Sequence, residues 1–150
     1  MQARNPSFAQ RVQESFALQG AMRTLGASLE EIAPGRVVIG MAHRAELTQQ
    51  HGFVHAGMVA AALDSACGFA AFTLMPADAG VLTIEFKINL LAPARGPRLR
   101  FEGLVTKGGR TISVVDGRAY QFEPGSDDQK LVATMTATVM TVVGRDDVRH

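Results

Sequence analysis

The residues best suited to chemistry are a polar stretch from Gln49 to Gly57 and a carboxylate that follows it, Asp64. An apolar run begins after this stretch, so we expect a helix to start between His55 and Gly57. The first turn of a helix offers unpaired backbone N–H groups and partial positive charge, which suit a carbonyl oxygen that gains negative charge. The small residues Ala56 and Gly57 would let a ligand approach these amides.

Asp64 lies within the same apolar run, among small and aliphatic neighbours. Burial disfavours the charged form, so we expect a raised carboxyl pKa and a better base. A structural alternative is that Asp64 caps or pairs with another group. Ala56 and Asp64 are eight residues apart, or about 12 Å along a helix. If both groups act on one substrate, they must come from different subunits, which predicts a composite site across a dimer axis.

Other reaction classes lack their motifs. The chain contains no GxGxxG or P-loop for phosphates, no HExxH or CxxC for zinc, and no GxSxG nucleophile elbow. Cys67 is the single cysteine, and its place inside the apolar run predicts a small buried hydrophobe rather than a nucleophile. We therefore expect no metal and no separate cofactor.

The pattern of apolar residues predicts the elements that position these groups. An amphipathic helix is expected over Pro6–Leu25 with a stop at Gly26, then a hairpin around Pro34-Gly35 and the apolar helix within Ala56–Met75. Four further strands are expected, with bulges or strong curvature at Gly103 and Gly117, and the charged tail 144–150 is expected to fray. The strand ranges are Val81–Leu91, Leu99–Thr106, Ile112–Phe122 and Leu131–Val143.

This order of elements predicts an α+β hotdog fold, in which a curved antiparallel sheet wraps around a long central helix. Too few crossover helices are present for a layered α/β sheet. The central segment is long enough to cross a bilayer, but a carboxylate near its middle and its Ala and Gly content indicate a buried helix instead.

Composition sets the remaining limits. With 150 residues, 47% hydrophobic and 19% charged, the chain is expected to form a single domain over 1–150 and is not disordered. A net charge of +1 argues against a nucleic-acid partner. One cysteine and no recognisable leader predict a reduced, cytoplasmic setting, without a membrane partner.

Three spaced motifs carry a resemblance to a known family: the run Leu47–Gly68, the run Val81–Gly96 ending in Leu-Ala-Pro-Ala-Arg-Gly, and Lys-Gly-Gly-Arg-Thr after it. Together they resemble the PaaI-like hotdog acyl-CoA thioesterases over most of the chain beyond about residue 20. The resemblance implies hydrolysis of an acyl-CoA to free acid and CoA, by a homodimer or a dimer of dimers, without metal.

The resemblance also assigns roles. Asp64 matches the carboxylate that activates water or attacks directly, and His55-Ala56-Gly57 matches a His-Gly-Gly turn whose amide polarises the thioester carbonyl. Gln49 stands where many members have Asn, and Thr83 where some have a hydroxyl that helps to hold the water, offered from the other subunit. The residues implied to contact CoA are Leu90, Leu91, Arg95, Lys107, Gly109, Arg110 and Thr111.

Two departures and two alternatives remain. Ala56 replaces the first glycine of the turn, and Gln49 is one methylene longer than Asn. A hotdog hydratase-dehydratase acting on acyl-CoA or acyl carrier protein is one alternative, although it usually needs a committed histidine. A non-catalytic acyl-CoA binding module is the other, and the buried carboxylate argues against it. Acyl length, the physiological pathway and the role of Asp64 as base or nucleophile stay open.

Overall fold

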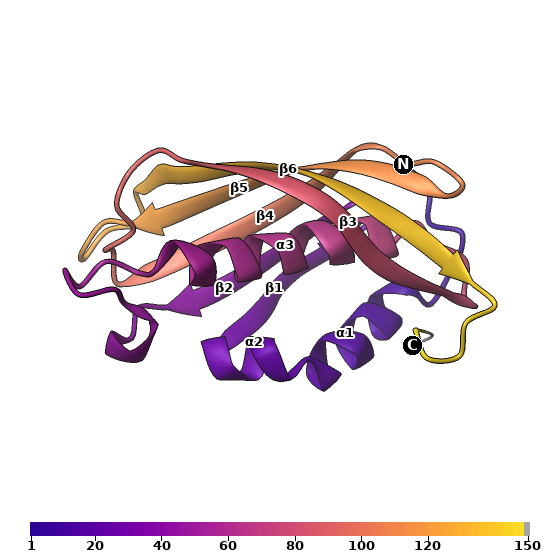
Figure 1. Ribbon diagram of the computed structural model, residues 1–150, viewed down its shortest axis with the longest axis horizontal. Coiled ribbons are helices and arrows are strands. Elements are labelled where there is room, and N and C mark those ends of the chain that lie inside the picture. Colours follow the sequence, from indigo (N-terminus) through magenta and orange to yellow (C-terminus); the bar gives the residue numbers. More distant parts are fainter. Residues whose placement is uncertain (149–150) are drawn as a thin grey trace.

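The computed structural model describes residues 1–148, and two layers of helix lie beneath one sheet (Figure 1). The elements in chain order are α1 (Phe8–Leu18), α2 (Gly20–Leu25), β1 (Ala27–Ala33), β2 (Arg36–Ala42), the 3-10 turn η1 (Ala45–Leu47), α3 (Ala56–Phe72), β3 (Ala79–Leu90), β4 (Arg98–Lys107), β5 (Ile112–Phe122) and β6 (Gln129–Val143). The predicted hotdog fold is confirmed.

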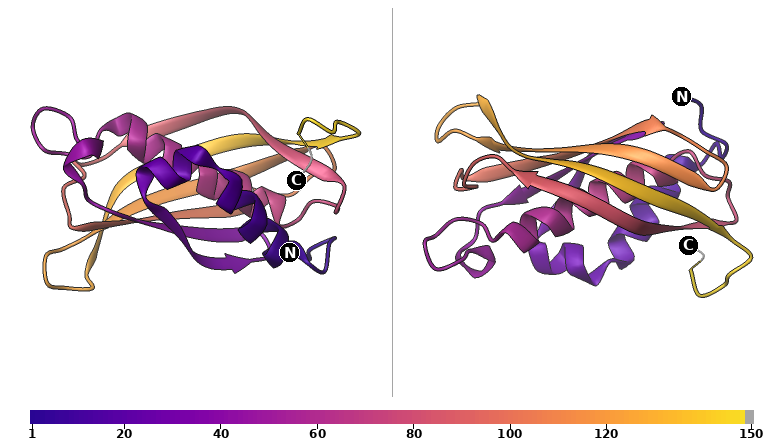
Figure 2. Two further views of the ribbon diagram at one scale, coloured as in Figure 1. Left: turned by 90° about the horizontal axis from the view of Figure 1, so that it is seen from below. Right: turned by 45° about the horizontal axis from the view of Figure 1, so that its top comes forward.

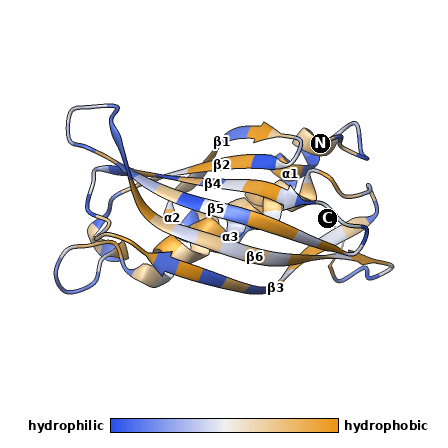
Figure 3. Ribbon diagram, turned by 90° about the horizontal axis from the view of Figure 1, so that it is seen from above, coloured by the Kyte–Doolittle hydropathy of each residue, from blue (hydrophilic) through white to orange (hydrophobic). Residues whose placement is uncertain are grey.

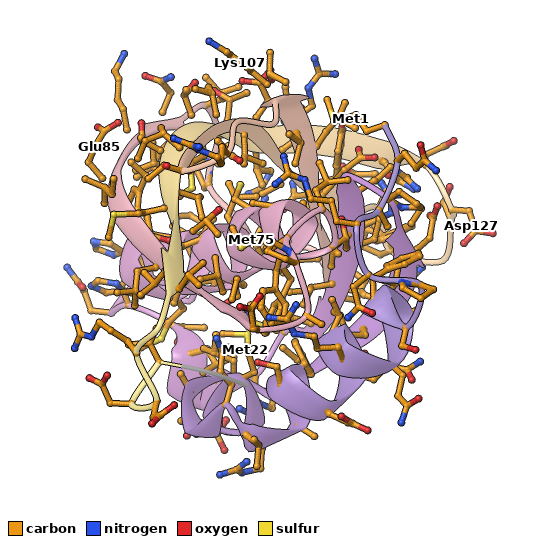
Figure 4. The ribbon with its side chains drawn as sticks, turned by 90° about the vertical axis from the view of Figure 1, so that its right-hand side faces the viewer. Met1, Met22, Met75, Glu85, Lys107 and Asp127 are labelled. Carbon is orange, nitrogen blue, oxygen red and sulfur yellow. The ribbon has the colours of Figure 1, made fainter. Side chains whose placement is uncertain are left out.

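All neighbouring strands pair antiparallel in the order β1-β2-β4-β5-β6-β3, so β1 and β3 form the two edges (Figure 3). The inner face of the sheet packs on α3, and α1 and α2 cover the opposite side of that helix (Figure 2). Met22 lies below α3 and Met75 near the centre of the end-on view in Figure 4. Both are buried, as expected of core residues.

The expected helix Pro6–Leu25 is two helices, because the chain breaks at Gln19. Gln19 is extended, with φ −71° and ψ 103°, and Gly20 begins α2. Glycine has a poor helix propensity, which favours a break next to Gly20. The spacing of apolar residues continues across this break and therefore did not reveal it. Gly26 then ends α2 in the left-handed conformation, as predicted.

The glycines Gly103 and Gly117 are not at bulges, so the bulge alternative of that expectation is wrong for both. They face each other in continuous register on β4 and β5, and the register shifts of this strand pair and of the next lie elsewhere. A Cβ at Gly103 would lie 2.3 Å from the Ala66 carbonyl oxygen, and one at Gly117 would lie 2.9 Å from the Cys67 sulfur. Glycine is needed here so that α3 can approach the sheet.

The helix formed by the apolar segment, α3, ends at Phe72. No helix among the described residues is long and apolar enough to cross a membrane. Of the charged tail, residues 144–148 form a turn in which the Val148 amide donates to the Arg145 carbonyl. Residues 149 and 150 lie outside the described part of the chain.

Candidate active site

The start of α3 is held by a network of backbone hydrogen bonds. The His55 amide donates to the Leu47 carbonyl and the Val54 amide to the Ala94 carbonyl, both at 2.8 Å. His55 is the N-cap, and its Nδ1 accepts a hydrogen bond of 2.8 Å from the Gly57 amide. The Gly57 amide therefore already has an acceptor, whereas the Ala56 amide has none among the described residues. Ala56 offers the available donor.

A cavity of about 370 Å³ opens at this helix start, next to the end of β3. Its lining residues are Gln49, Phe53, Val54, Ala56, Val59, Leu90, Leu91, Ala92, Pro93, Ala94 and Val132. Most of this wall is apolar, with Gln49 as its polar side chain. The Gln49 side-chain oxygen accepts from the His51 amide, which orients the side chain, and its NH₂ group is a further donor for a ligand.

Asp64 lies two turns further along α3 and is half-buried. The Thr83 hydroxyl of the same chain donates to its carboxylate at 2.8 Å. Thr83 faces α3 because its register partner on β6, Val139, belongs to the buried face of the sheet. Desolvation raises the pKa of Asp64, and the Thr83 hydrogen bond opposes part of that rise. The carboxylate and the hydroxyl therefore pair within one chain, and not across subunits as the resemblance implied for Thr83.

A second cavity, of about 210 Å³, opens beside this pair. Its lining residues are Gln19, Asp64, Ser65, Gly68, Phe69, Val81, Leu82 and Thr83. Sequence reasoning missed Gln19 and Ser65, whose side chains meet in a hydrogen bond of 3.2 Å. Two signals pointed to them: a polar residue on the apolar stripe of the N-terminal helix, and a serine adjacent to the buried aspartate.

Within one chain the structure does not bring the two predicted halves of the site together. Ala56 and Asp64 belong to the same unbroken helix, about 12 Å apart along its axis. Ala56 lines the first cavity and Asp64 the second, and neither of these two cavities has both residues in its wall. The two groups of a single chain are therefore too far apart to act on one substrate, which is the condition that a composite site requires.

The residues expected to contact CoA fall into two groups at opposite ends of the sheet. Leu90 and Leu91 line the first cavity, and Arg95 follows in the adjoining loop, where the buried Gln121 side-chain oxygen accepts from the Arg95 and Gly96 amides. Strand β4 separates this end from the β4–β5 turn by roughly 30 Å. That turn holds Lys107, Gly109, Arg110 and Thr111, and Lys107 points outward at the top of Figure 4.

Other reactive groups are poorly placed. Cys67 is fully buried, and burial raises the pKa of its thiol, with the charges of Asp64 and Asp116 adding to the rise. The thiol is therefore unreactive, as expected. No histidine lines either cavity. In the part of the chain that the structure describes, no group of His, Cys, Asp and Glu could hold a metal ion.

Comparison with known proteins identifies the family of this chain. The family model described as "Thioesterase superfamily" matches residues 51–126. A solved thioesterase family protein from Silicibacter pomeroyi is 52% identical, with a TM-score of 0.89 over 91% of this chain and 99% of the other. The PaaI protein of E. coli, from the phenylacetic acid degradation operon, is similar in fold alone, with 19% identity and a TM-score of 0.81 over 92% of this chain and 95% of the other.

Curated relatives that are described as esterases support the same family assignment. A candidate esterase of Saccharolobus solfataricus is 31% identical over 73% of this chain and 72% of its own length. A second one from this organism is 37% identical over 55% of this chain, but the match spans 58% of that relative, less than two thirds of its length. The chain belongs to the thioesterase superfamily and has the hotdog fold of its PaaI-like members, which supports a hydrolase of thioesters.

Proposed function

We propose that the protein hydrolyses acyl-CoA thioesters in two composite sites of a homodimer. One observation carries the proposal: the helix start and the Asp64–Thr83 pair open into separate cavities, and one unpaired edge strand borders both. Leu90 of β3 lines the first cavity, and Val81, Leu82 and Thr83 line the second. Pairing of β3 with a second copy would join the first cavity of each subunit to the second cavity of the other.

The exposure of β3 supports this pairing. Ile84 is 53% exposed, Phe86 41% and Leu90 55%, on a strand of 12 residues at the edge of the sheet. A long, apolar edge strand is a template for another strand. Antiparallel pairing centred between Phe86 and Lys87 would set Leu90 opposite Thr83 of the partner subunit. A dimer of dimers would need a further contact, which this edge does not supply.

The same pairing would reunite the residues proposed to contact CoA. In an antiparallel pair of sheets, the Leu90–Arg95 end of one subunit meets the Lys107–Thr111 end of the other. Leu90 and Leu91 would then contact the pantetheine arm, while Lys107, Arg110 and Arg95 supply cations for the phosphates. Arg95, Lys107 and Arg110 are all exposed, as such a role requires.

In the proposed reaction, the Asp64 carboxylate takes a proton from water while the water oxygen attacks the thioester carbonyl carbon. The carbonyl electron pair moves to its oxygen, which the Ala56 amide of the other subunit holds by a hydrogen bond. When the carbonyl re-forms, the C–S bond breaks and the CoA sulfur leaves with the proton from Asp64. Alternatively, the carboxylate attacks directly, CoA thiolate leaves, and water hydrolyses the resulting anhydride.

The hydratase alternative lacks support, because no histidine among the described residues lines the cavity of Asp64. The proposal places the reaction in the cytoplasm, on the ground of the single cysteine. CoA enters as part of the substrate, and no other cofactor is invoked.

The test is CoA release from a panel of aliphatic and aromatic acyl-CoAs by the wild type and by Asp64→Asn. The matched control is Asp116→Asn, because Asp116 also accepts a 2.8 Å hydrogen bond from a threonine, Thr106, but is exposed outside both cavities. We expect turnover that is lost in Asp64→Asn and kept in Asp116→Asn. Binding of acyl-CoA without any wild-type turnover would favour the binding module instead, and equal turnover in all three proteins would remove Asp64 from the mechanism.

A further inference from the structure

Gly68 occupies a position where packing does not call for glycine. It is buried inside α3, four residues after Asp64 and hence on the same face of the helix. Glycine destabilises a helix interior relative to alanine. Its φ is not positive, and a Cβ built there would have no heavy atom within 4 Å apart from its chain neighbours and the backbone of its own helix. At Gly103 and Gly117, by contrast, a Cβ would collide with α3. The missing side chain at Gly68 leaves space rather than permitting contact.

That space belongs to the cavity beside Asp64, which has Gly68 in its wall. Phe69 is held in place by its ring contact with Phe16 of α1, with centroids 5.8 Å apart, and Val81 lies on the facing strand. The cavity therefore has a packed apolar side next to the reactive carboxylate.

The break between α1 and α2 supplies a further wall of the cavity. Gln19 is the extended residue at that break, and its side-chain oxygen accepts the hydrogen bond from Ser65. An alkyl chain that extended past Gln19 would have to separate this pair and cover both polar groups without replacing their hydrogen bond, which is unfavourable. Gln19 therefore limits the length of a group that enters from Asp64.

We propose that this cavity holds the acyl group of the substrate, that the missing side chain at Gly68 leaves room for an acyl chain that extends past Asp64, and that Gln19 ends the cavity. The inference rests on the proposed function, in which the thioester carbonyl lies between Asp64 and the Ala56 amide of the other subunit. Since the first cavity takes the pantetheine arm, the second is left for the acyl group. A volume of about 210 Å³ compares with the roughly 150 Å³ that accommodates benzene. The proposed substrates are therefore acyl-CoAs with short acyl groups, comparable in size to benzene or somewhat larger.

The experiment measures kcat/KM for straight-chain acyl-CoAs of increasing length with the wild type, Gly68→Ala and Gln19→Ala. One methylene in a hydrophobic pocket changes discrimination by about 10-fold or more. Gly68→Ala should lower kcat/KM about 10-fold for the longest good substrate and leave the shortest substrates unaffected. Gln19→Ala should raise kcat/KM about 10-fold for chains just beyond the wild-type limit.

The controls make the same chemical changes away from the cavity. Gly20→Ala replaces an exposed helical glycine, and Gln13→Ala an exposed glutamine of α1, and neither residue lines the cavity. Both should keep the wild-type length profile. Gly68→Ala should also keep or raise the Tm, because the added methyl group displaces nothing within 4 Å.

Three results would overturn the inference. If both cavity variants keep the wild-type profile while all proteins turn over acyl-CoA, the acyl group lies elsewhere and the proposed function stands. If Gly68→Ala lowers the Tm and dissociates the dimer, a partner residue fills the space. If the wild type hydrolyses no acyl-CoA, the proposed function fails and this inference fails with it.

Discussion

Replacement of Ala56 by proline isolates the backbone donor on which the proposed mechanism depends. Ala56 is the first residue of α3, a position that proline favours because its N–H has no partner within the helix. Proline also restricts the residue before it to extended conformations, and the N-cap His55 already has φ −59° and ψ 136°. The change therefore removes one N–H while the helix start keeps its shape.

The size of the effect follows from the hydrogen bonds at this helix start. The neighbouring Gly57 amide is occupied by His55 Nδ1 at 2.8 Å, so it cannot replace the missing donor without losing that bond. Loss of one donor to a developing oxyanion lowers kcat by about 100- to 1,000-fold, or about 2.7–4 kcal/mol. We expect Ala56→Pro to show a loss in this range with a Tm close to that of the wild type.

The assay is steady-state CoA release on the best substrate of the panel, with thermal unfolding as the check on structure. Ala56→Gly is the matched control, because it keeps the N–H and removes only the methyl group. Its kcat should stay within a few-fold of the wild-type value. If Ala56→Pro keeps wild-type kcat at an unchanged Tm, the Ala56 amide does not polarise the carbonyl and the reasoning fails.

Three further predictions follow from the same geometry. A 1:1 mixture of Asp64→Asn and Ala56→Pro, refolded together, should recover about one quarter of wild-type activity. Half of random dimers are mixed, and each mixed dimer has one intact composite site. No recovery despite verified mixed dimers would place the site within one chain. Because burial raises the pKa of Asp64, the acid limb of the pH profile of kcat/KM should lie at a higher pH than the pKa of an ordinary aspartate. Thr83→Val should move this limb to a still higher pH, because it removes the hydrogen bond that opposes the rise. An acid limb at the same pH in Thr83→Val would contradict this reasoning. Gln121→Met should raise KM several-fold with little change in kcat, because the Gln121 side-chain oxygen accepts from the amides of the Arg95 loop. The control is Thr73→Val, which removes a similar buried acceptor, that of the Gly35 amide at the far end of α3. This control should lower the Tm without changing KM.

The pKa of Asp64 also makes the stability of the fold depend on pH. The folded state binds the Asp64 proton more tightly than the unfolded state, because burial raises the folded pKa. This contribution to the free energy of unfolding is therefore present at low pH and is lost as the pH rises from the ordinary aspartate range through the raised pKa. The ionised form of Asp64, which the reaction needs, therefore stabilises the folded state less than the protonated form does.

Some parts of the site were predictable because they depend on short-range geometry. The start of α3 could be placed between His55 and Gly57 because a polar stretch gives way to an apolar run there, and the helix begins at Ala56. The constant rise of a helix then separated Ala56 from Asp64 without knowledge of the fold. Thr83 entered only through the family resemblance, because its contact with Asp64 depends on the register of β3 against β6.

Other parts were not predictable from the pattern. Gln19 continues the spacing of the N-terminal helix, and nothing in that spacing marks the break that turns it toward Ser65. The expectation of bulges at Gly103 and Gly117 was wrong because a glycine in a strand has several possible reasons, and only the position of α3 distinguishes them. Gly68 shows the opposite case, a glycine beside empty space.

By itself, the sequence determined the order of helices and strands apart from the break at Gln19, the hotdog fold and the helix that carries both chemical groups. Periodicity and helix rise are properties of neighbouring residues, so they survive without a structure. Only the tertiary structure decided that the helix start and Asp64 open into two cavities, that the Leu90 and Lys107 groups lie at opposite ends of the sheet, and that β3 is left as its edge. These facts depend on which segments pack together over long sequence separations, and a local pattern does not record such packing.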